Sequence, residues 1–439
     1  MTTGDNGGGR FNRRRFIQTV GTGAIAGAAG CLGGVGGGGG GGDDTVTVGA
    51  VYPLSGSVAE TGQAIQNFIQ SAADDIINVE NSELGSLSLA SEAGLSNLGG
   101  AEVEVVFADH RGDPGQGRAE AERLMQEENV DMLVGGYHSS VTKTISAAAE
   151  REGVPHVNFE SSSPDLTERG LEYFWRIGPH DGTYTQNMFS FFTEMNEQHD
   201  AGIESVAIIH EDTEFGTISA RTQEELAEEN GLEVVAGPIA YTAESVTSLE
   251  SEVQRIRQAD PDVLLPSSYI RDAEILLSDM EKLGWFPKMV MGQNAGFNQP
   301  SFVENTQLSN YVCSRSTYAD DLPKSVPELG KYSEFMSEKV GTGFNGVYIR
   351  SWGGFLTAMH AVNEAGSTEP DALKETLDGL QVEKLTTGLP YGVEFNDNRQ
   401  NAKASGVLIQ YKGATGNTIW PFDLAGTEPD FPAPGWDER

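Results

Sequence analysis

Between residues 45 and 291 the chain alternates short, β-branched segments with longer segments whose apolar residues recur at helical spacing. The first strand-like segment is Thr45 to Tyr52 (TVTVGAVY), and the first helical segment is Thr61 to Val79. Further strands are predicted at 102–107, 131–135, 154–158, 172–177, 205–210, 232–239, 263–266 and 288–291, and further helices at 117–128, 141–150, 183–198, 215–229, 246–258 and 271–284. Strands separated by helices run parallel with helices on both faces, so the alternation predicts an α/β fold with parallel sheets.

The number of predicted strands indicates two sheets rather than one. A single sheet would need more strands than the roughly ten that twisted open sheets usually contain. Helices dominate from Pro327 to Leu380, and strands return near Tyr391 to Phe395 and Val407 to Tyr411. The segment from Asn81 to Gly100 is rich in Ser, Gly and Leu and is interpreted as a surface insertion. We therefore expect two doubly wound parallel-sheet lobes.

The first 31 residues are built like an export signal. Arg13 and Arg14 lie in a charged segment before an apolar stretch, and Ala28-Ala29-Gly30 precedes Cys31. The arginine pair resembles the twin-arginine motif. The residues before Cys31 resemble a lipobox, in which the cysteine is lipidated, although Ala28 stands where Leu is usual. The apolar stretch is shorter than the about 20 residues that span a bilayer, which argues against an uncleaved membrane helix.

The same segment contains a G-x-G-x-x-A pattern, from Gly21 to Ala26. A phosphate-binding loop of this type requires a preceding strand, and arginines stand there instead, so a dinucleotide site is not expected. The glycine run from Gly33 to Gly42 is predicted to be a flexible tether, because poly-Gly buries nothing and loses the most entropy on ordering. The folded part is expected to begin near Thr45. Cys313 lies in an apolar run and is expected to be buried and unreactive.

The net charge of the 439-residue chain is -37, from 65 acidic and 28 basic residues. Such an excess repels nucleic acids and anionic lipid surfaces, so neither is expected as a partner. The acids are spread over the whole sequence and Lys is scarce, a pattern that resembles halophile adaptation; a moderately acidic mesophile protein is the alternative. Together with the export signal, this pattern resembles a haloarchaeal surface lipoprotein.

Candidate functional residues follow the predicted strands, because open α/β sheets bind ligands beyond the carboxyl ends of their strands. The strand at 131–135 leads into Tyr137, His138, Ser139 and Ser140 at a helix start, a cradle suited to a carboxylate or another anion. A simple N-cap role for one of these serines is the alternative. Comparable loops follow the other strands: 159–164 (FESSSP), 211–216 (EDTEFG), 267–269 (SSY) and 292–296 (GQNAG).

These loops offer hydroxyls, aromatic rings and amides but no paired nucleophile and base. No G-x-S-x-G elbow is present. The segment from Asp109 to Pro114 contains carboxylates and a histidine, but Arg111 in its middle argues against a metal, and Asp-Pro is a turn signal. The sequence therefore predicts recognition of a small solute rather than its chemical conversion, with no metal and no cofactor.

An ordered set of short motifs runs along the chain from Thr45 to Tyr411. They are VGAVYPLSG (48–56) with Gly62, Asp109 with Asp113-Pro114, Gly135 with Ser139-Ser140 and Thr142, SSSPDLT (161–167), Arg176 with Pro179, Asp181 and Gln186, Phe215-Gly216, and Met291-Gly292. Through these motifs and their order, the chain resembles the branched-chain amino acid-binding proteins of ABC importers, which have the type I periplasmic-binding fold.

The resemblance implies two lobes that are joined by three crossovers and close on the ligand as a hinge. Lobe one would comprise 45–177 and 317–388, lobe two 178–316 and 389–422, and a tail 423–439. The implied ligand residues are hydroxyls, aromatic residues and a side-chain subsite: Ser139, Ser140, Ser161, Ser162, Phe215, Tyr269, Thr61, Tyr137 and His138. The acid that pairs with a ligand ammonium in amino-acid binders falls at Asn294, which cannot neutralise a cation. Either Asp212, Glu214 or Glu160 replaces it, or the ligand is not an amino acid.

The resemblance implies an exported, lipid-anchored and monomeric receptor that delivers a branched-chain amino acid, or a related amino acid or amide, to ABC permease subunits. A sensory ligand-binding protein of the same fold is the alternative. A secreted hydrolase is a remote alternative that steady turnover of a substrate would reveal.

Overall fold

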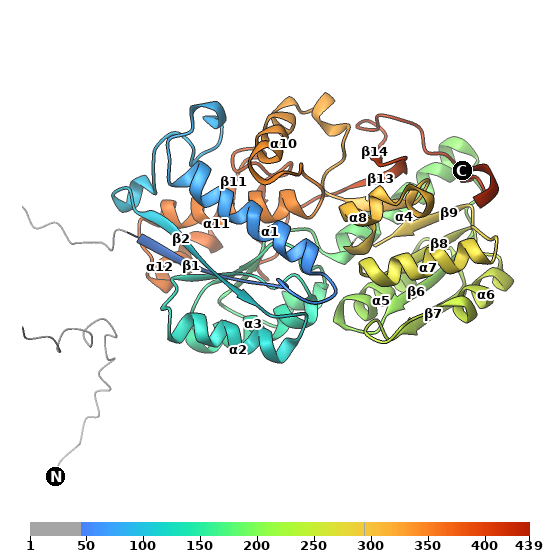
Figure 1. The fold of residues 1–439 in the computed structure, drawn as a ribbon, viewed down its shortest axis with the longest axis horizontal. Helices are drawn as coiled ribbons and strands as arrows, with labels where there is room; N and C mark the ends of the chain where they lie inside the picture. Colours follow the sequence, from blue (N-terminus) through green and yellow to red (C-terminus); the bar gives the residue numbers. More distant parts are fainter. Residues whose placement is uncertain (1–44, 294) are drawn as a thin grey trace, which may run out of the picture. The chain divides into compact units, whose positions relative to one another are not determined.

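The computed structural model describes residues 45–293 and 295–439 as an α/β structure with two separate large sheets (Figure 1). The predicted export signal with Arg13 and Arg14, the lipid site at Cys31, the glycine tether and Asn294 lie outside the described residues. Within the described ranges, no helix combines the length and the hydropathy needed to cross a membrane.

The first sheet is entirely parallel, with strand order β2-β1-β3-β4-β5. Its strands are β1 (Thr45–Tyr52), β2 (Glu102–Asp109), β3 (Met132–Gly135), β4 (His156–Asn158) and β5 (Phe174–Arg176). Helices α2 (Pro114–Gln126) and α3 (Ser139–Glu152) cover one face, and α1 (Ala59–Ala72) packs on the other. Because both faces are covered, β1 buries nearly every side chain, as its apolar sequence predicts.

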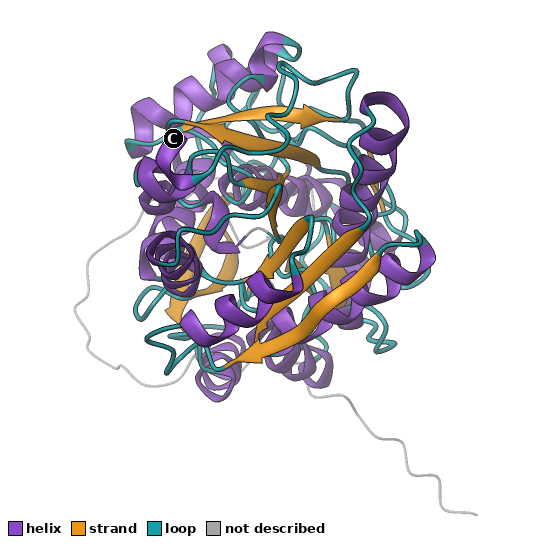
Figure 2. Cartoon of the chain, turned by 90° about the vertical axis from the view of Figure 1, so that its right-hand side faces the viewer, coloured by secondary structure: helices purple, strands orange, loops and turns teal. Residues whose placement is uncertain are grey.

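The second sheet has strand order β14-β13-β10-β9-β8-β6-β7. Its strands are β6 (Ser205–Glu211), β7 (Glu233–Tyr241), β8 (Val263–Ser267), β9 (Met289–Gly292), β10 (Cys313–Ser316), β13 (Val407–Lys412) and β14 (Thr415–Trp420). The helices of this part are α4 (Asp181–His199), α5 (Glu214–Glu229), α6 (Glu250–Ala259), α7 (Ile270–Lys282), α8 (Pro300–Glu304) and α9 (Thr306–Ser309). Figure 2 looks onto this part of the chain, where helices lie on both sides of the strands.

One edge of the second sheet departs from the expected all-parallel order. β13 pairs antiparallel with β10, and β14 pairs antiparallel with β13. The two residues Gly413 and Ala414 that join β13 to β14 are too few for a crossover, so only a hairpin can form. The sequence predicts β13 but not β14, whose residues Thr415–Trp420 include Gly and Asn and lack a clear alternating pattern.

Three helices return to the first sheet after β10: α10 (Pro327–Val340), α11 (Tyr348–Ala365) and α12 (Pro370–Asp378). α11 is buried on nearly all sides and packs along α1, where the rings of Phe68 and Tyr348 stack with centroids 5.0 Å apart. A small pair, β11 (Gln381–Val382) and β12 (Val393–Glu394), precedes the return to β13. The chain thus passes between the two sheets three times, after β5, after β10 and after β12.

We call the first sheet with α1–α3 and α10–α12 the first lobe, and the second sheet with α4–α9 the second lobe. The predicted α/β fold with parallel sheets in two lobes is confirmed. The segment 81–100 differs from the expected surface insertion, because Leu84, Leu87 and Leu95 are buried in the first-lobe core. Cys313 is buried, as expected, and has no disulfide partner among the described residues.

Candidate functional site

The first predicted ligand loop follows β3 and turns sharply into α3. Gly135 and Gly136 have φ values of +100° and +117°, which favour glycine, and a Cβ on Gly136 would lie 2.0 Å from Thr142 Oγ1. The turn makes Ser139 the first residue of α3. The free N–H groups and the positive dipole end of this helix therefore lie at the carboxyl edge of the first sheet.

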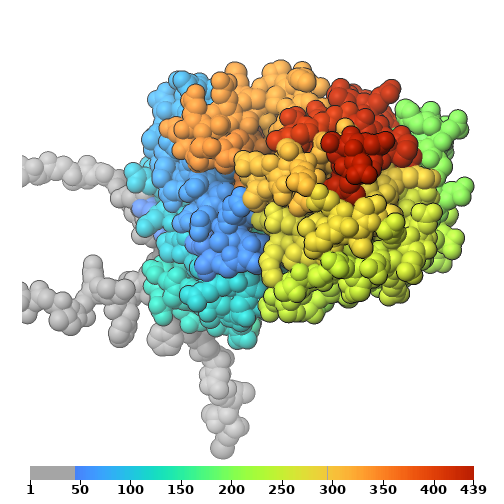
Figure 3. All heavy atoms as spheres, turned by 45° about the vertical axis from the view of Figure 1, so that its right-hand side comes forward, coloured from blue at the N-terminus to red at the C-terminus, as the bar shows by residue number. Residues whose placement is uncertain are grey.

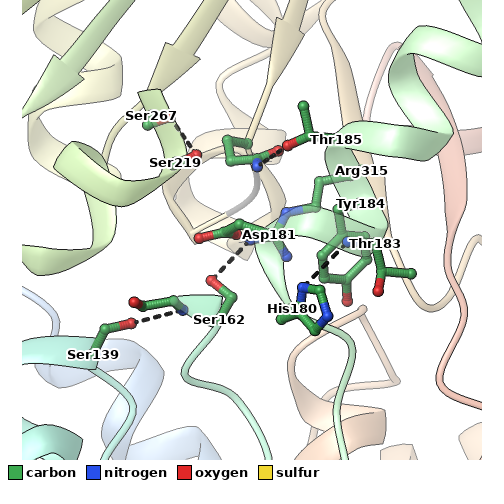
Figure 4. A network of polar contacts seen from close by, with 12 residues as sticks. Ser139, Ser162, His180, Asp181, Thr183, Tyr184, Thr185, Ser219, Ser267 and Arg315 are labelled. Atoms are coloured by element: carbon green, nitrogen blue, oxygen red, sulfur yellow. Dashed lines mark hydrogen bonds and ion pairs between the residues drawn. The ribbon is translucent and has the colours of Figure 1, made fainter. Parts of the chain in front are cut away.

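The second predicted loop follows β4 and is hydrogen-bonded to the first. Ser161 Oγ donates to the carbonyl of Tyr137 at 2.9 Å and lies 2.6 Å from Thr142 Oγ1. The N–H of Ser163 donates to Ser139 Oγ at 3.3 Å. The Ser161 hydroxyl is therefore engaged within the first lobe, whereas the side chain of Ser162 extends toward the second lobe (Figure 4).

Aromatic rings from both lobes meet in front of these loops. Tyr269, at the start of α7, has its ring centroid 4.9 Å from His138 and 6.3 Å from Tyr137. Phe215, at the start of α5, lies 5.5 Å from Tyr269. Burial, together with nearby His110, holds the pKa of His138 well below its usual range, so its ring is neutral. This ring cluster can stack against an apolar or planar solute.

A cavity of about 20 Å³ lies where the loops of the two lobes meet. Its lining residues are Tyr137, Ser139, Glu160, Ser162, Phe215, Tyr269, Ala295, Arg315, Val347 and Arg350. This volume holds about one water molecule. In Figure 3 the segments of the first lobe (blue to cyan) touch those of the second (yellow to green) along the face drawn. A solute larger than water therefore requires the lobes to move apart.

Five of the sequence-predicted site residues line this cavity: Tyr137, Ser139, Ser162, Phe215 and Tyr269. Four others are described but not among its lining residues: Thr61, His138, Ser140 and Ser161. Thr61 is fully buried in α1, and Ser140 is half-buried in α3. Asn294 lies outside the described residues. That these residues bind a ligand remains a prediction.

Arg315 is a cavity residue that the sequence analysis does not single out. It extends from β10 of the second lobe and is 2% exposed. Its Nη2 donates to Asp181 Oδ1 at 2.8 Å and to Ser162 Oγ, in the first lobe, at 3.2 Å (Figure 4). Burial lowers the pKa of Arg315 and the nearby Arg350 guanidinium acts in the same direction, while Asp181 opposes both. Arg315 thus spans the two lobes with its charge shielded from water.

Arg350 is the second arginine at the cavity. It belongs to the first lobe and reaches Tyr184 on α4 of the second lobe. It extends from α11 of the first lobe and is 3% exposed. Its Nη1 donates to the hydroxyl of Tyr184 at 2.9 Å and to Thr317 Oγ1 at 3.3 Å. The ring of Tyr184 also lies under the Arg315 guanidinium, 3.8 Å from its central carbon. One tyrosine therefore contacts both guanidinium groups.

Glu160 is the one carboxylate that lines the cavity in the described part of the chain. Its Oε1 accepts hydrogen bonds from Tyr52 Oη at 3.1 Å and from Ser351 Oγ at 2.5 Å. Burial raises the pKa of Glu160 to about 7, and the hydrogen bond from Ser351 and the charge of Arg350 counteract only part of this rise. Of the three acids that the sequence analysis offers in place of Asn294, only Glu160 is at the cavity.

The other two acids are engaged elsewhere. Asp212 accepts a hydrogen bond from Thr242 Oγ1 at 2.8 Å on the exposed surface. Glu214 forms an ion pair of 2.9 Å with Lys143, whose side chain is 47% exposed. Neither Asp212 nor Glu214 lines the cavity.

The raised pKa of Glu160 predicts a pH dependence of stability. A carboxyl whose pKa in the folded protein lies above its unfolded value of 4.5 binds its proton more tightly in the folded state. Its contribution to the free energy of unfolding is therefore fully present below pH 4.5 and is lost as the pH rises through about 7. Relative to Glu160→Gln, the native protein should therefore lose roughly 2–3 kcal/mol of unfolding free energy between these pH values. Urea unfolding of both proteins across this range measures the difference. Parallel pH profiles would show that Glu160 does not titrate in this window.

The site has the chemistry of reversible recognition. It combines serine hydroxyls, a helix start, aromatic rings and two guanidinium groups. No cluster of three or more His, Cys, Asp or Glu residues with metal-binding geometry occurs among the described residues. This two-lobed α/β protein, with polar and aromatic groups converging on a cavity between its lobes, has the features of a protein that binds a small solute between two domains.

Comparison with known proteins gives the family. Residues 45–416 match the model of the periplasmic binding protein family, so this chain belongs to that family. The chain is 25% identical over 402 residues to Leu/Ile/Val-binding protein homolog 7 of Brucella abortus, covering 88% of this chain and 94% of the relative. It is 26% identical over 394 residues to homolog 8 of the same species, covering 87% of this chain and 91% of the relative.

Solved structures share the fold. A leucine-binding protein of Thermotoga maritima superposes with a TM-score of 0.70 at 18% identity, covering 86% of this chain and all of that one (100%). A solute-binding protein of an ABC transporter from Rhodopseudomonas palustris, solved in complex with 3,4-dihydroxybenzoic acid, also has a TM-score of 0.70, at 17% identity, covering 86% of this chain and 96% of that one. The relatives are named as binding proteins rather than enzymes, and membership of the family implies an exported protein.

Proposed function

We propose that this protein is an extracytoplasmic receptor that captures a small organic solute between its lobes and delivers it to the permease of an ABC importer. The observation that carries the proposal is the convergence of serine loops from the first sheet and aromatic rings from the second on one cavity. Relatives along nearly the whole chain are named Leu/Ile/Val-binding proteins, which supports an amino acid or a related acid or amide as the solute.

The cellular setting is part of the same proposal. Arg13 and Arg14 would direct export, and lipidation of Cys31 would hold a monomeric receptor at the outer face of the membrane by its glycine tether. Residues 45–177 with 317–388 and residues 178–316 with 389–422 would move as the two rigid parts. The acidic surface would keep the protein soluble in concentrated salt, as in haloarchaeal proteins.

Closure of the lobes on the solute would provide the signal for the permease. In the described structure α3 and α5 approach each other across the lobes through the ion pair between Lys143 and Glu214. A second exposed pair joins Arg221 of α5 to Asp165 of the first lobe at 2.9 Å. Exposed pairs of this kind stabilise by about 0–1 kcal/mol, so they can hold the lobes together without preventing opening.

A ligand screen by thermal unfolding tests the proposal. Amino acids, their amides and simple carboxylic acids would be added to the full chain in concentrated salt. A solute at 100 times its dissociation constant should stabilise the protein by about 2.7 kcal/mol. Steady conversion of a solute instead of stoichiometric binding would contradict a receptor.

Tyr269→Ala provides the matched test of the cavity. Removing the ring that joins Tyr137, His138 and Phe215 should weaken solute binding by about tenfold or more, equivalent to 1.4 kcal/mol. Tyr173→Ala is the control, because Tyr173 is half-buried and bonds Asp371 away from the cavity. Calorimetric titration of both variants gives the affinities. Unchanged affinity in Tyr269→Ala would place the binding site elsewhere.

A further inference from the structure

Two buried arginines from opposite lobes reach the same small cavity. Arg315 comes from β10 and Arg350 from α11, both line the cavity, and both contact Tyr184. Burial lowers the pKa of Arg315, and the like charge of Arg350 acts in the same direction. An anion placed between the two guanidinium groups would relieve the repulsion between their like charges.

The hydrogen bonds of these two arginines are incomplete. Within the described part of the chain, the Nε–H groups of Arg315 and of Arg350 are both buried and have no acceptor. A buried charged donor without an acceptor is strongly unfavourable. A carboxylate has two oxygens that accept charge-assisted hydrogen bonds from guanidinium groups in a planar, two-pronged geometry. It is therefore the ligand group that best completes this pair.

The charges around the cavity also favour an anion. Arg315 and Arg350 line the cavity, and Arg176, which is also buried, donates to the carbonyls of the adjoining loop at Ser161 and Ser163. Two buried carboxyl groups act on these arginines. Asp181 faces Arg176 and Arg315, and Glu160 faces Arg350. Arg176 also faces Glu168, which is exposed to solvent and therefore screened. With Glu160 protonated, Arg315, Arg350 and Asp181 leave one net positive charge at the cavity, and ionised Glu160 cancels it.

The buried carboxyl groups near the cavity leave little negative charge to neutralise the ammonium group of a ligand. Oδ1 of Asp181 is paired with Arg315, whereas its Oδ2 has no donor among the described residues. The carboxylate of Glu211 accepts from the N–H groups of Thr213 and Gly216, and Asp272 accepts from the hydroxyl of Tyr241, so both serve their own lobe. Asn294 is uncharged by its chemistry. Among the described residues, Glu160 is the only carboxyl group that lines the cavity. Its Oε2 has no donor there, but it lies beside Arg350, and burial raises its pKa to about 7, so it is a weak counter-charge for an ammonium.

We propose that this cleft takes a carboxylic acid anion without an α-ammonium group, and that Arg315 and Arg350 hold its carboxylate while the rings of Tyr137, Phe215 and Tyr269 cover its apolar body. The inference rests on the proposed receptor function and names its substrate class. In this arrangement the ligand carboxylate joins the lobes, because one arginine belongs to each. The carboxyl groups at the cavity are engaged by the protein, so a ligand ammonium would lack a counter-charge, and the site then selects acids over zwitterionic amino acids.

Matched probe sets test the substrate class. One set is leucine, 4-methylpentanoate, which lacks the amino group, and 3-methylbutylamine, which lacks the carboxylate. The second set is phenylalanine, 3-phenylpropanoate and 2-phenylethylamine. Thermal shift followed by calorimetry on the full chain should show the acid of at least one set binding roughly 10- to 100-fold more tightly than its amino acid, and no binding of the amines.

The outcomes separate this proposal from the receptor function. Tighter binding of an amino acid or an amine than of the matched acid would overturn the acid-anion proposal and leave the receptor standing. If none of the six probes stabilised the protein, the acid-anion proposal would fail, whereas the receptor function would fail only if the wider screen of amino acids, amides and carboxylic acids also found no ligand. Tighter binding of both acids than of both amino acids would be the strongest support.

Two variants test the arginine directly. Arg315→Gln leaves Asp181 buried without its partner, so the double variant Arg315→Gln/Asp181→Asn removes both charges together. Each should bind the acid probe roughly 10- to 100-fold more weakly than the native protein. Arg255→Gln, at an exposed position on α6 in the same lobe, should bind it normally. Native acid affinity in the folded double variant would exclude Arg315 as a residue that holds the ligand carboxylate.

Discussion

Replacing Asp181 with alanine is expected to lower the free energy of unfolding by about 3–5 kcal/mol. Asp181 is completely buried at the first residue of α4, where the chain first enters the second lobe. Its Oδ1 accepts the 2.8 Å bond from Arg315, and its N–H donates to the carbonyl of Ser162 at 2.7 Å. Alanine leaves the Arg315 charge buried without a carboxylate, and the loss is large because the interior stabilises a lone charge poorly.

Urea unfolding of the native protein and of Asp181→Ala measures this effect. The double variant Asp181→Ala/Arg315→Met should regain most of the lost stability, since it removes both charges and fills the space with an apolar chain. Asp165→Ala is the control for an exposed pair: its ion pair with Arg221 joins side chains 40% and 51% exposed, so its loss should be within about 1 kcal/mol. A loss below about 1 kcal/mol in Asp181→Ala would show that water reaches Arg315.

The fold was predictable because its signals are local. β1 shows the alternating and then continuous apolar pattern of a strand covered on both faces, and α3 shows helical spacing over fourteen residues. Such periodicities require no knowledge of the partner elements. β14 was missed because its Thr, Gly and Asn residues are stabilised by pairing with β13 rather than by a pattern of their own. The buried leucines of 81–100 were missed because their partners belong to α11 and its neighbours, far along the sequence.

The cavity was predictable only in part, for a different physical reason. The serine loops and the aromatic residues follow strands, so the rule for parallel sheets locates them. Arg315 and Arg350 lie 35 positions apart and meet only because the chain passes between the lobes after β10. One signal was available in the sequence. The chain has only 28 Lys and Arg residues, and both Arg315 and Arg350 lie in otherwise uncharged segments, VCSRSTY and YIRSWGG. Arginine is almost never fully buried unless it is paired, so an arginine carried into the core by an apolar segment indicates a buried partner.

Replacing Arg176 with methionine is expected to destabilise the protein by roughly 3 kcal/mol or more and to weaken solute binding. Arg176 ends β5 and is completely buried. Its guanidinium donates to the carbonyl of Ser163 at 2.5 Å and to that of Ser161 at 3.3 Å. It also donates to Gln400 Oε1 at 2.6 Å, next to the third passage between the lobes. Methionine fills the volume but leaves these acceptors buried and unpaired.

The effect on binding separates Arg176 from a residue that only stabilises the core. Releasing the carbonyls of Ser161 and Ser163 frees the loop that carries Ser162, so affinity for an acid probe should fall even where the variant is fully folded. Trp175→Phe, at the neighbouring buried position, loses the bond from its indole N–H to Asp378 and should lower stability without changing affinity. Calorimetric titration at a temperature where all three proteins are folded distinguishes the two cases. Native affinity in folded Arg176→Met would mean that the serine loop keeps its shape without this guanidinium, and that Arg315 and Arg350 alone orient the ligand.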